Sequence, residues 1–161
     1  MVFNLCLNYL QNTNDAEEVT QDVFVKVYKL FDSFKEQSSV KTWIYRIAIN
    51  QCLDFLKAKK RQKRFGIHIP IWGNSQESVY PTPSDFNHPG VLLEDKEALK
   101  QLFRHINSLP HNQKTALILK AIEGLSQKEI AAILDVSIKS VESLLSRAKD
   151  NLRKKIDSSE G

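Results

Sequence analysis

Cations and hydrogen-bond donors recur at helical spacing along residues 38–64. On a helix they share one narrow side, which only Leu53 interrupts: Thr42, Arg46, Asn50, Lys57, Lys60 and Arg64. Residues 41–64 contain eight Lys and Arg against one Asp, a net charge of +7. Such a side is suited to the phosphates and bases of an anionic polymer. A solvated polar face with a basic end is an equally good interpretation of this stretch alone.

The remaining residues of this stretch predict the helix that positions those donors. At ~100° per residue one broad sector is apolar, as in a helix packed into a core. It contains Ile44, Tyr45, Ala48, Ile49, Cys52, Phe55 and Leu56.

The positive charge is local. The chain has 161 residues and a net charge of +4, but residues 1–40 carry −3, residues 65–93 carry −2 and residues 94–161 carry +2. A hydrophobic content of 42% allows one domain or two small ones. Neither an apolar run of membrane-spanning length nor a signal peptide occurs, so we expect a soluble, cytoplasmic protein without membrane insertion.

Residue types for catalysis or metal binding are scattered. Cys6 and Cys52 are too few and too far apart for a metal cluster or a disulfide framework, and are expected to be buried free thiols. The four histidines, at 68, 88, 105 and 111, are isolated from cysteine or carboxylate patterns. With no phosphate-binding glycine loop and no nucleophile–base pair, the sequence predicts no metal, no cofactor and no enzyme activity.

Residues 1–34 predict two helices. An apolar helix over residues 1–10 begins at the first residue, so we expect native sequence upstream. Asp15 and Glu18 have capping-box spacing, opening a helix to about Phe31. Its predicted core side is Val19, Val23, Phe24, Val27, Leu30 and Phe31. Its other side is acidic and surrounds one exposed valine, with Glu18, Gln21, Asp22, Val25 and Lys29, where an ordinary solvated face is the alternative.

Residues 65–91 separate two helical regions. They contain four of the five prolines and no Lys or Arg, which is typical of a flexible linker. We therefore predict an all-α fold with domains at residues 1–64 and 92–157.

The second region predicts a helix-turn-helix. A helix over residues 92–106 ends before Pro110, and a second over residues 111–122 has Gly124 at its C′ position. Ser126 and Glu129 form a capping box, Asp135 and Val136 a tight turn, and Ser137 caps the last helix. That helix directs Val141, Leu144, Leu145, Ala148 and Leu152 inward and Lys139, Ser143, Ser146, Arg147, Asp150 and Lys154 outward. A plain helical hairpin is the alternative.

Three segments together resemble the sigma-70 family of bacterial RNA polymerase initiation factors, in its extracytoplasmic-function (ECF) group. They are NDAEEVTQDVFVKVYKLFDSF, SSVKTWIYRIAINQCLDFLKAKKR and LPHNQKTALILKAIEGLSQKEIAAILDVSIKSVESLLSRAKDNLRK, in the family's order. The family's first domain normally begins with a longer helix than residues 1–10 supply. The resemblance implies a factor that binds core RNA polymerase and promoter DNA to direct transcription initiation, without catalysis of its own.

The resemblance also implies roles for single residues. Docking on core polymerase is implied for Glu18, Gln21, Asp22 and Val25. Opening and holding the −10 element is implied for Ser38, Ser39, Lys41, Thr42, Trp43, Arg46, Asn50, Lys57, Lys60, Arg61 and Arg64. Reading the −35 element is implied for Lys139, Ser140, Glu142, Ser143, Ser146 and Arg147. Trp43 is equally compatible with a place in the core.

We also expect an anti-sigma factor, because a free initiation factor would compete for polymerase continuously. Two other classes of function are compatible with parts of the sequence. One is a dimeric helix-turn-helix regulator whose residues 1–64 form an effector or dimerisation domain. The other is an enzyme acting on nucleic acid, against which the lack of a carboxylate cluster beside the basic stretch is the contrary sign.

Overall fold

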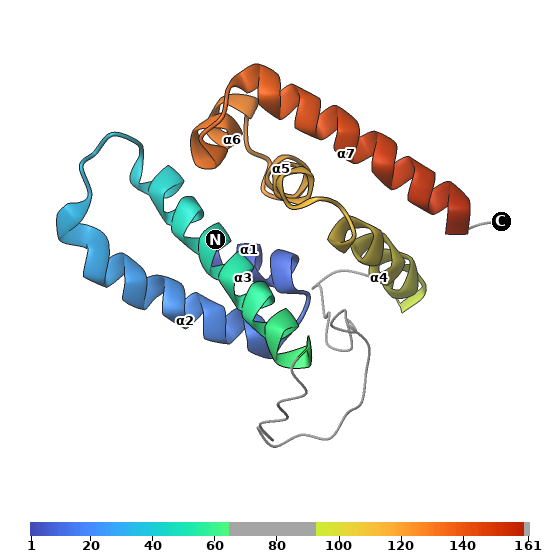
Figure 1. The fold of residues 1–161 in the computed structure, drawn as a ribbon, viewed down its shortest axis with the longest axis horizontal. Helices are drawn as coiled ribbons and strands as arrows, with labels where there is room; N and C mark the ends of the chain where they lie inside the picture. Colours follow the sequence, from blue (N-terminus) through green and yellow to red (C-terminus); the bar gives the residue numbers. More distant parts are fainter. Residues whose placement is uncertain (65–92, 160–161) are drawn as a thin grey trace. The chain divides into compact units, whose positions relative to one another are not determined.

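The computed structural model describes residues 1–64 and 93–159. Within these ranges the chain forms seven α-helices and one short 3-10 helix, and no strand (Figure 1), which confirms the all-α fold. The chain divides into two compact units. The described residues of the first are Met1–Phe34 and 47–64, and those of the second are Lys35–Arg46 and 93–159. The predicted linker, residues 65–91, lies outside the described residues.

The first unit contains α1 (Val2–Leu10), α2 (Thr13–Leu30), the 3-10 helix η1 (Phe31–Ser33) and most of α3 (Val40–Arg64). Its core comprises residues from all three α-helices: Val2, Leu5, Cys6, Tyr9, Leu10, Ala16, Val19, Val23, Ile47, Ala48, Ile49 and Cys52. Both cysteines are buried free thiols, as predicted.

The predicted cap of α2 is wrong by three residues. Asn12, in extended conformation, is the N-cap, and its Oδ1 accepts a hydrogen bond from the Asp15 N–H at 2.9 Å. The preceding Gln11 adopts the left-handed conformation and is 1% exposed. Its Nε2 donates to the Asn8 carbonyl at 2.7 Å. Asp15 therefore lies in the first turn of α2, where its carboxylate pairs with Lys59 Nζ at 2.6 Å.

The predicted core side of α2 is correct only for its first half. Val19 and Val23 are at most 1% exposed, whereas Phe24 is 55%, Leu30 37% and Phe31 59% exposed. α1 has 9 residues and α2 has 18, so the shorter helix covers only part of its neighbour. The periodicity identified the apolar residues of α2, but it could not show how much of α2 is covered by α1.

The second unit contains α4 (Leu93–Asn107), α5 (His111–Ala121), α6 (Gln127–Leu134) and α7 (Ile138–Ser159). Its core includes Phe103, Ile106, Leu109, Ala116, Ile118, Leu119, Leu125, Ile130, Ala131, Ile133, Val141, Leu145 and Ala148. Pro110 directly precedes α5. Gly124 has a φ of +69°, but the C-cap of α5 is Ile122, so Glu123 is the C′ residue and the predicted position of the glycine is wrong by one residue.

The α6–α7 pair has the geometry predicted for a helix-turn-helix. Ser126 Oγ accepts from the Glu129 N–H at 3.2 Å, while Glu129 Oε2 accepts from the Ser126 N–H at 2.8 Å. Asp135 ends α6 in the left-handed conformation, with φ 57° and ψ 48°. Ser137 Oγ then accepts from the Ser140 N–H at 3.1 Å, which caps the start of α7.

Helix length and hydropathy also bear on membrane insertion. Among the described helices, none combines the length and the apolar content that crossing a bilayer requires.

The capping box makes a first testable prediction. Ser126→Ala should lower the free energy of unfolding by about 1 kcal/mol, because the Glu129 N–H loses its acceptor and the Glu129 carboxylate loses the hydroxyl donor. Urea denaturation followed by circular dichroism would measure it. Ser158→Ala is the matched control: its hydroxyl donates only to the Lys154 carbonyl near the exposed end of α7. Equal losses in both variants would contradict a specific role for the box.

The same variant should show a pH signature. Hydrogen bonds from Ser126, with a smaller contribution from Lys41, lower the pKa of Glu129 below its ordinary value. A lowered folded-state pKa contributes stability that is complete above the unfolded pKa and is lost as the pH falls through the folded one. The difference between wild type and Ser126→Ala should therefore shrink below about pH 4.

Candidate nucleic-acid interface

The basic end of α3 presents cations of two kinds. Lys57, Lys60 and Arg61 are exposed, and Lys57 forms only a loose 3.5 Å pair with Asp54. Lys59 is tied to Asp15, whose side chain is only 17% exposed. The exposed set can approach phosphates, whereas Lys59 helps to hold α3 against the start of α2. Asn50 is also exposed, and the side chain of Arg64 lies outside the described residues.

Ser39 caps the N-terminus of α3. Ser39 Oγ accepts from the Thr42 N–H at 3.1 Å and lies 2.9 Å from Thr42 Oγ1. Thr42 is 7% exposed, so the prediction that it lies on the narrow side of the helix that carries the exposed donors is wrong. The capping turn folds its hydroxyl back onto Ser39. Ser38 and Trp43 are both partly exposed. Trp43 is therefore neither fully buried in the core nor fully open to solvent.

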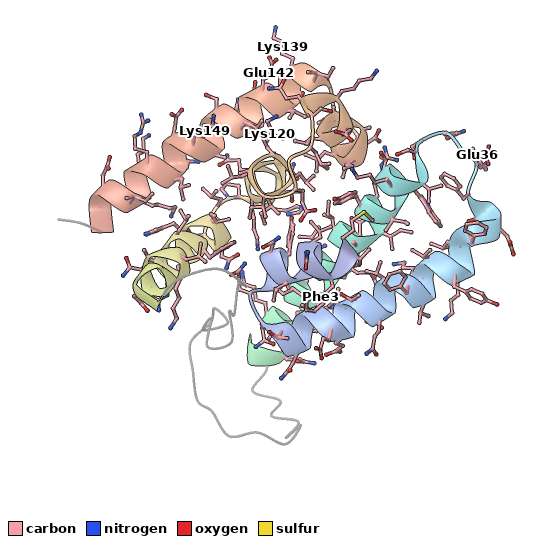
Figure 2. All side chains as sticks on the ribbon, turned by 180° about the vertical axis from the view of Figure 1, so that it is seen from behind. Phe3, Glu36, Lys120, Lys139, Glu142 and Lys149 are labelled. Atoms are coloured by element: carbon pink, nitrogen blue, oxygen red, sulfur yellow. The ribbon has the colours of Figure 1, made fainter. Side chains whose placement is uncertain are left out.

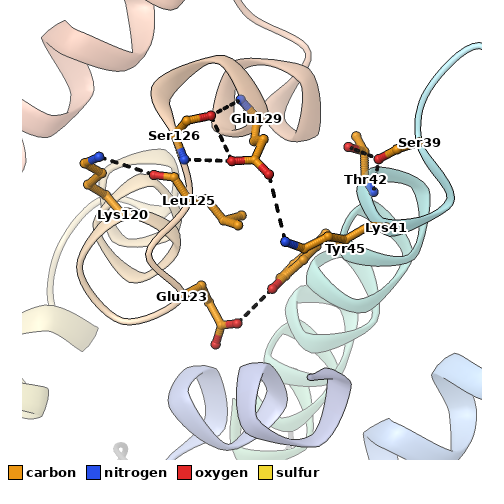
Figure 3. Close-up of polar contacts among 9 residues, drawn as sticks. All are labelled: Ser39, Lys41, Thr42, Tyr45, Lys120, Glu123, Leu125, Ser126 and Glu129. Carbon is orange, nitrogen blue, oxygen red and sulfur yellow. Dashed lines mark hydrogen bonds and ion pairs between the residues drawn. The ribbon is translucent and has the colours of Figure 1, made fainter.

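Three residues in the first turns of α3 contact other parts of the second unit. Lys41 Nζ lies 3.9 Å from Glu129 Oε1, and Tyr45 Oη donates to Glu123 Oε2 at 2.8 Å (Figure 3). Burial, reinforced by Glu123, raises the pKa of Tyr45. Arg46 Nε donates to the Ala132 carbonyl at 3.0 Å. No signal in the sequence indicated these contacts, which join residues up to 86 positions apart.

The outward side of α7 is open to solvent. All six residues implied for reading the −35 element are exposed: Lys139, Ser140, Glu142, Ser143, Ser146 and Arg147. Figure 2 shows Lys139 and Glu142 at the first turns of the helix. Ser143 donates its hydroxyl to the Lys139 carbonyl at 3.1 Å, and Ser140 is engaged in the cap. Lys139, Glu142 and Arg147 are therefore the residues of this set with the longest free reach.

One face of α2 is acidic and apolar together. Glu18, Gln21, Asp22 and Val25 are all exposed, as predicted, with Val25 at 52%. Beside them Tyr28 is 85% exposed. With Phe24 of the same helix and Phe31 of η1 it forms an aromatic row at helical spacing, whereas the sequence analysis placed both phenylalanines on the core side. We call these seven residues the α2 face. Large exposed apolar groups rimmed by charge are typical of a protein–protein contact.

Comparison with known proteins identifies the family. Sigma-70 region 2 matches residues 1–62, and sigma-70 region 4 matches residues 99–152. The ECF RNA polymerase sigma-E factor of Escherichia coli (strain K12) is 33% identical over 144 residues, which cover 89% of this chain and 75% of that protein. This chain is a sigma factor of the sigma-70 family, in its ECF group.

Further relatives agree. The ECF sigma factor SigW of Bacillus subtilis (strain 168) is 31% identical over 159 residues, covering 96% of this chain and 82% of that protein. This sigma factor therefore acts in transcription initiation by RNA polymerase and is not an enzyme. The interpretation as a dimeric operator-binding regulator is not favoured.

Solved structures share the fold. The sigma factor RpoE of Bartonella quintana, in complex with the anti-sigma factor NepR, matches with a TM-score of 0.65 and 24% identity, covering 97% of this chain and 89% of that one. CnrH, in complex with the cytosolic domain of CnrY, matches with a TM-score of 0.66 and 22% identity, covering 98% of this chain and 80% of that one.

The cap of α3 makes a second prediction. Ser39→Ala should lower the free energy of unfolding by about 1 kcal/mol, because the Thr42 N–H loses its acceptor. Ser38→Ala is the matched control, since its hydroxyl makes only a 3.5 Å contact with the Ser39 carbonyl. Urea denaturation would compare the two. A Ser39→Ala variant as stable as Ser38→Ala would show that the hydroxyl is not structural and would leave it a role in binding DNA only.

Proposed function

We propose that this sigma factor divides promoter recognition between its two helical regions. Residues 1–64 dock on core polymerase and open the −10 element, and residues 92–157 read the −35 element. Residues 65–91 link the two regions. One observation carries the proposal: the first 64 residues present both the acidic and aromatic α2 face and the cationic end of α3. A factor that holds a protein and a DNA strand at once needs two surfaces of this different character.

The α2 face supplies the contact with polymerase. Glu18 and Asp22 lie one turn apart, and Val25 continues the same side of the helix. Exposed apolar groups among carboxylates suit a basic partner helix, because the apolar groups provide buried area and the charges provide orientation. We assign the docking role to Glu18, Gln21, Asp22 and Val25, with Phe24 and Tyr28 at the edge of the contact.

The start and outer side of α3 supply the contact with the melted strand. Lys57, Lys60 and Arg61 hold backbone phosphates by charge, and Arg64 belongs to the same basic stretch. Lys41, Trp43, Arg46 and Asn50 have the functional groups to stack on or hydrogen-bond unpaired bases. Ser38 and Ser39 place the start of the helix, and Thr42 supports that cap rather than contacting DNA directly.

The outward side of α7 supplies the upstream contact. In a helix-turn-helix the second helix enters the major groove, and the residues in its first turns reach base edges. Lys139 and Arg147 are assigned to phosphate or guanine. Glu142 and Ser143 are within reach of base edges, and Ser140 and Ser146 are suited to phosphates.

Solved structures support a proposal for the regulation of this chain. RpoE of Bartonella quintana is bound to the anti-sigma factor NepR, and CnrH is bound to the cytosolic domain of CnrY. We assign this chain an anti-sigma factor as well, and a cytoplasmic location, where polymerase acts.

Promoter-specific transcription tests the proposal as a whole. Purified chain added to core polymerase should give run-off transcripts from a matching promoter, and core alone should give none. Promoters can be found by mapping transcription starts after overexpression in the native host. Binding to operator DNA without any transcription from core would overturn the proposal in favour of a conventional regulator.

The docking face makes a third prediction. Asp22→Lys combined with Val25→Lys should abolish co-purification with core polymerase, because two positive charges replace a carboxylate and an apolar contact. Both positions are exposed, so the unfolding transition should stay within about 0.5 kcal/mol of wild type.

The control for this variant introduces the same charges elsewhere. Glu97 and Leu102 are also an exposed acid and an exposed apolar residue, on α4. Glu97→Lys combined with Leu102→Lys should co-purify with polymerase as wild type does. Retention of polymerase by the α2 variant would refute this docking face.

The −35 reader makes a fourth prediction. Arg147→Ala should weaken promoter selection by about 1–3 kcal/mol at one base pair of the upstream element if the guanidinium contacts a base. Run-off transcription on promoters that differ at single positions would measure it. A uniform loss across all sequences would assign Arg147 to phosphate instead.

Lys149→Ala is the matched control. It removes the same charge from an exposed position on the same helix, about 200° around its axis from Arg147. Lys149 is not among the residues assigned to the upstream element in the proposed arrangement, so promoter selection should be unchanged. A loss as large as that of Arg147→Ala would show that only net charge matters.

A further inference from the structure

The first unit brings two thiols together at the meeting point of its three helices. Cys6 of α1 and Cys52 of α3 are both 0% exposed. The two side chains are hydrogen-bonded to each other, and Cys6 is also hydrogen-bonded to Thr20 of α2. The sequence analysis judged the two cysteines too far apart to be linked, since 46 positions separate them. The fold removes that objection.

Hydrogen-bonded thiols need only a small approach to become bonded. A disulfide places its sulfur atoms about 2.05 Å apart and requires side chains that point toward one another. Here the two thiols are already hydrogen-bonded, and they come from two different helices. The hydrogen bond from Cys52 favours the thiolate of Cys6 and lowers its pKa, while burial opposes that effect. The thiolate is the form that reacts with oxidants.

Access of an oxidant requires a transient opening of the first unit, because both thiols are fully buried. Folded domains open locally at free energies below that of global unfolding, and an opening around α1 or α3 would expose the pair to solvent.

We propose that Cys6 and Cys52 form an intramolecular disulfide when hydrogen peroxide reaches them, so that oxidation links α1 covalently to α3. The thiolate of one cysteine attacks the peroxide oxygen, which gives a sulfenic acid and releases hydroxide that is protonated to water. The sulfur of the second cysteine then displaces the sulfenic oxygen as a second water. Two thiols lose two electrons and two protons in total, and the peroxide is reduced. A dithiol reductant reverses the bond.

The consequence is a redox-dependent stability of the first unit. The bond closes a long loop that contains all of α2, which restricts the unfolded chain more than the folded one. Oxidation should therefore raise the melting temperature of the first unit by roughly 10 °C. No residue of the α2 face or of the exposed basic set takes part in the bond.

Peroxide treatment of the full chain tests the proposal. Wild-type protein exposed to hydrogen peroxide at neutral pH should lose about 2 Da in intact mass and lose both maleimide-reactive thiols on denaturation. A peptide containing Cys6 should be found joined to one containing Cys52. Dithiothreitol should restore the mass, the thiols and the original melting temperature.

Single substitutions provide the control. Cys6→Ser and Cys52→Ser should each show neither the mass loss nor the rise in melting temperature. Should either serine variant fail to fold, the peptide map of wild type still decides the matter. Thiols that stay reactive, that gain oxygen without joining, or that join only between two chains would overturn the proposal. So would an oxidised monomer that melts below the reduced one.

Discussion

Burial of one side of α3 is the constraint on which the first unit depends. Ile47, Ala48, Ile49 and Cys52 are at most 7% exposed, and they pack against the residues of α1 and α2 that line the same core. Removing such side chains from water is the dominant stabilising term in a domain of this size. Because successive residues of a helix are ~100° apart, burying this side determines where the others point. Asn50, Lys57 and Lys60 are exposed as a consequence.

Salt links refine that arrangement. Lys59 and Asp15 meet at 2.6 Å with the carboxylate largely covered, so this pair anchors the basic end of α3 to the first turn of α2. A partly buried pair is screened less by salt than the exposed Lys57–Asp54 pair. The basic stretch thus combines one cation that holds the helix in place with others that are available to phosphates. Net charge alone does not distinguish the two kinds.

Sequence periodicity and cap residues predicted much of the second unit and less of the first. Ser126, Glu129 and Ser137 each have a local partner three residues away, so the helix-turn-helix was accessible from spacing. Asp15 also had that spacing, but Asn12 was the better cap because the chain enters α2 in an extended conformation there. Residue spacing alone cannot choose between two neighbouring candidate N-cap residues, because the choice depends on the conformation of the chain that precedes the helix. That conformation depends on Gln11, which is left-handed and buried.

The remaining failures concern contacts between distant segments. Phe24 and Phe31 have the spacing of core residues, yet their exposure depends on the length of α1, which no pattern within α2 records. Likewise the hydrogen bond of Tyr45 with Glu123 and the meeting of Cys6 with Cys52 join positions whose local sequence shows no trace of a partner. Periodicity predicts which side of a helix a side chain points to. Which other residues it meets there depends on tertiary packing.

The aromatic row on α2 shows why that distinction matters for function. If Phe24 and Phe31 were buried in the core, the proposed docking surface would be only a sparse acidic patch around Val25. Because Phe24 and Phe31 are exposed, they add apolar area to the α2 face. Tyr28 adds a phenol hydroxyl to the same face. Apolar contact loses little strength when salt rises, whereas the phosphate contacts proposed for Lys57, Lys60 and Arg61 would weaken steeply. In the proposed arrangement the chain therefore keeps its protein partner at salt concentrations that release the DNA.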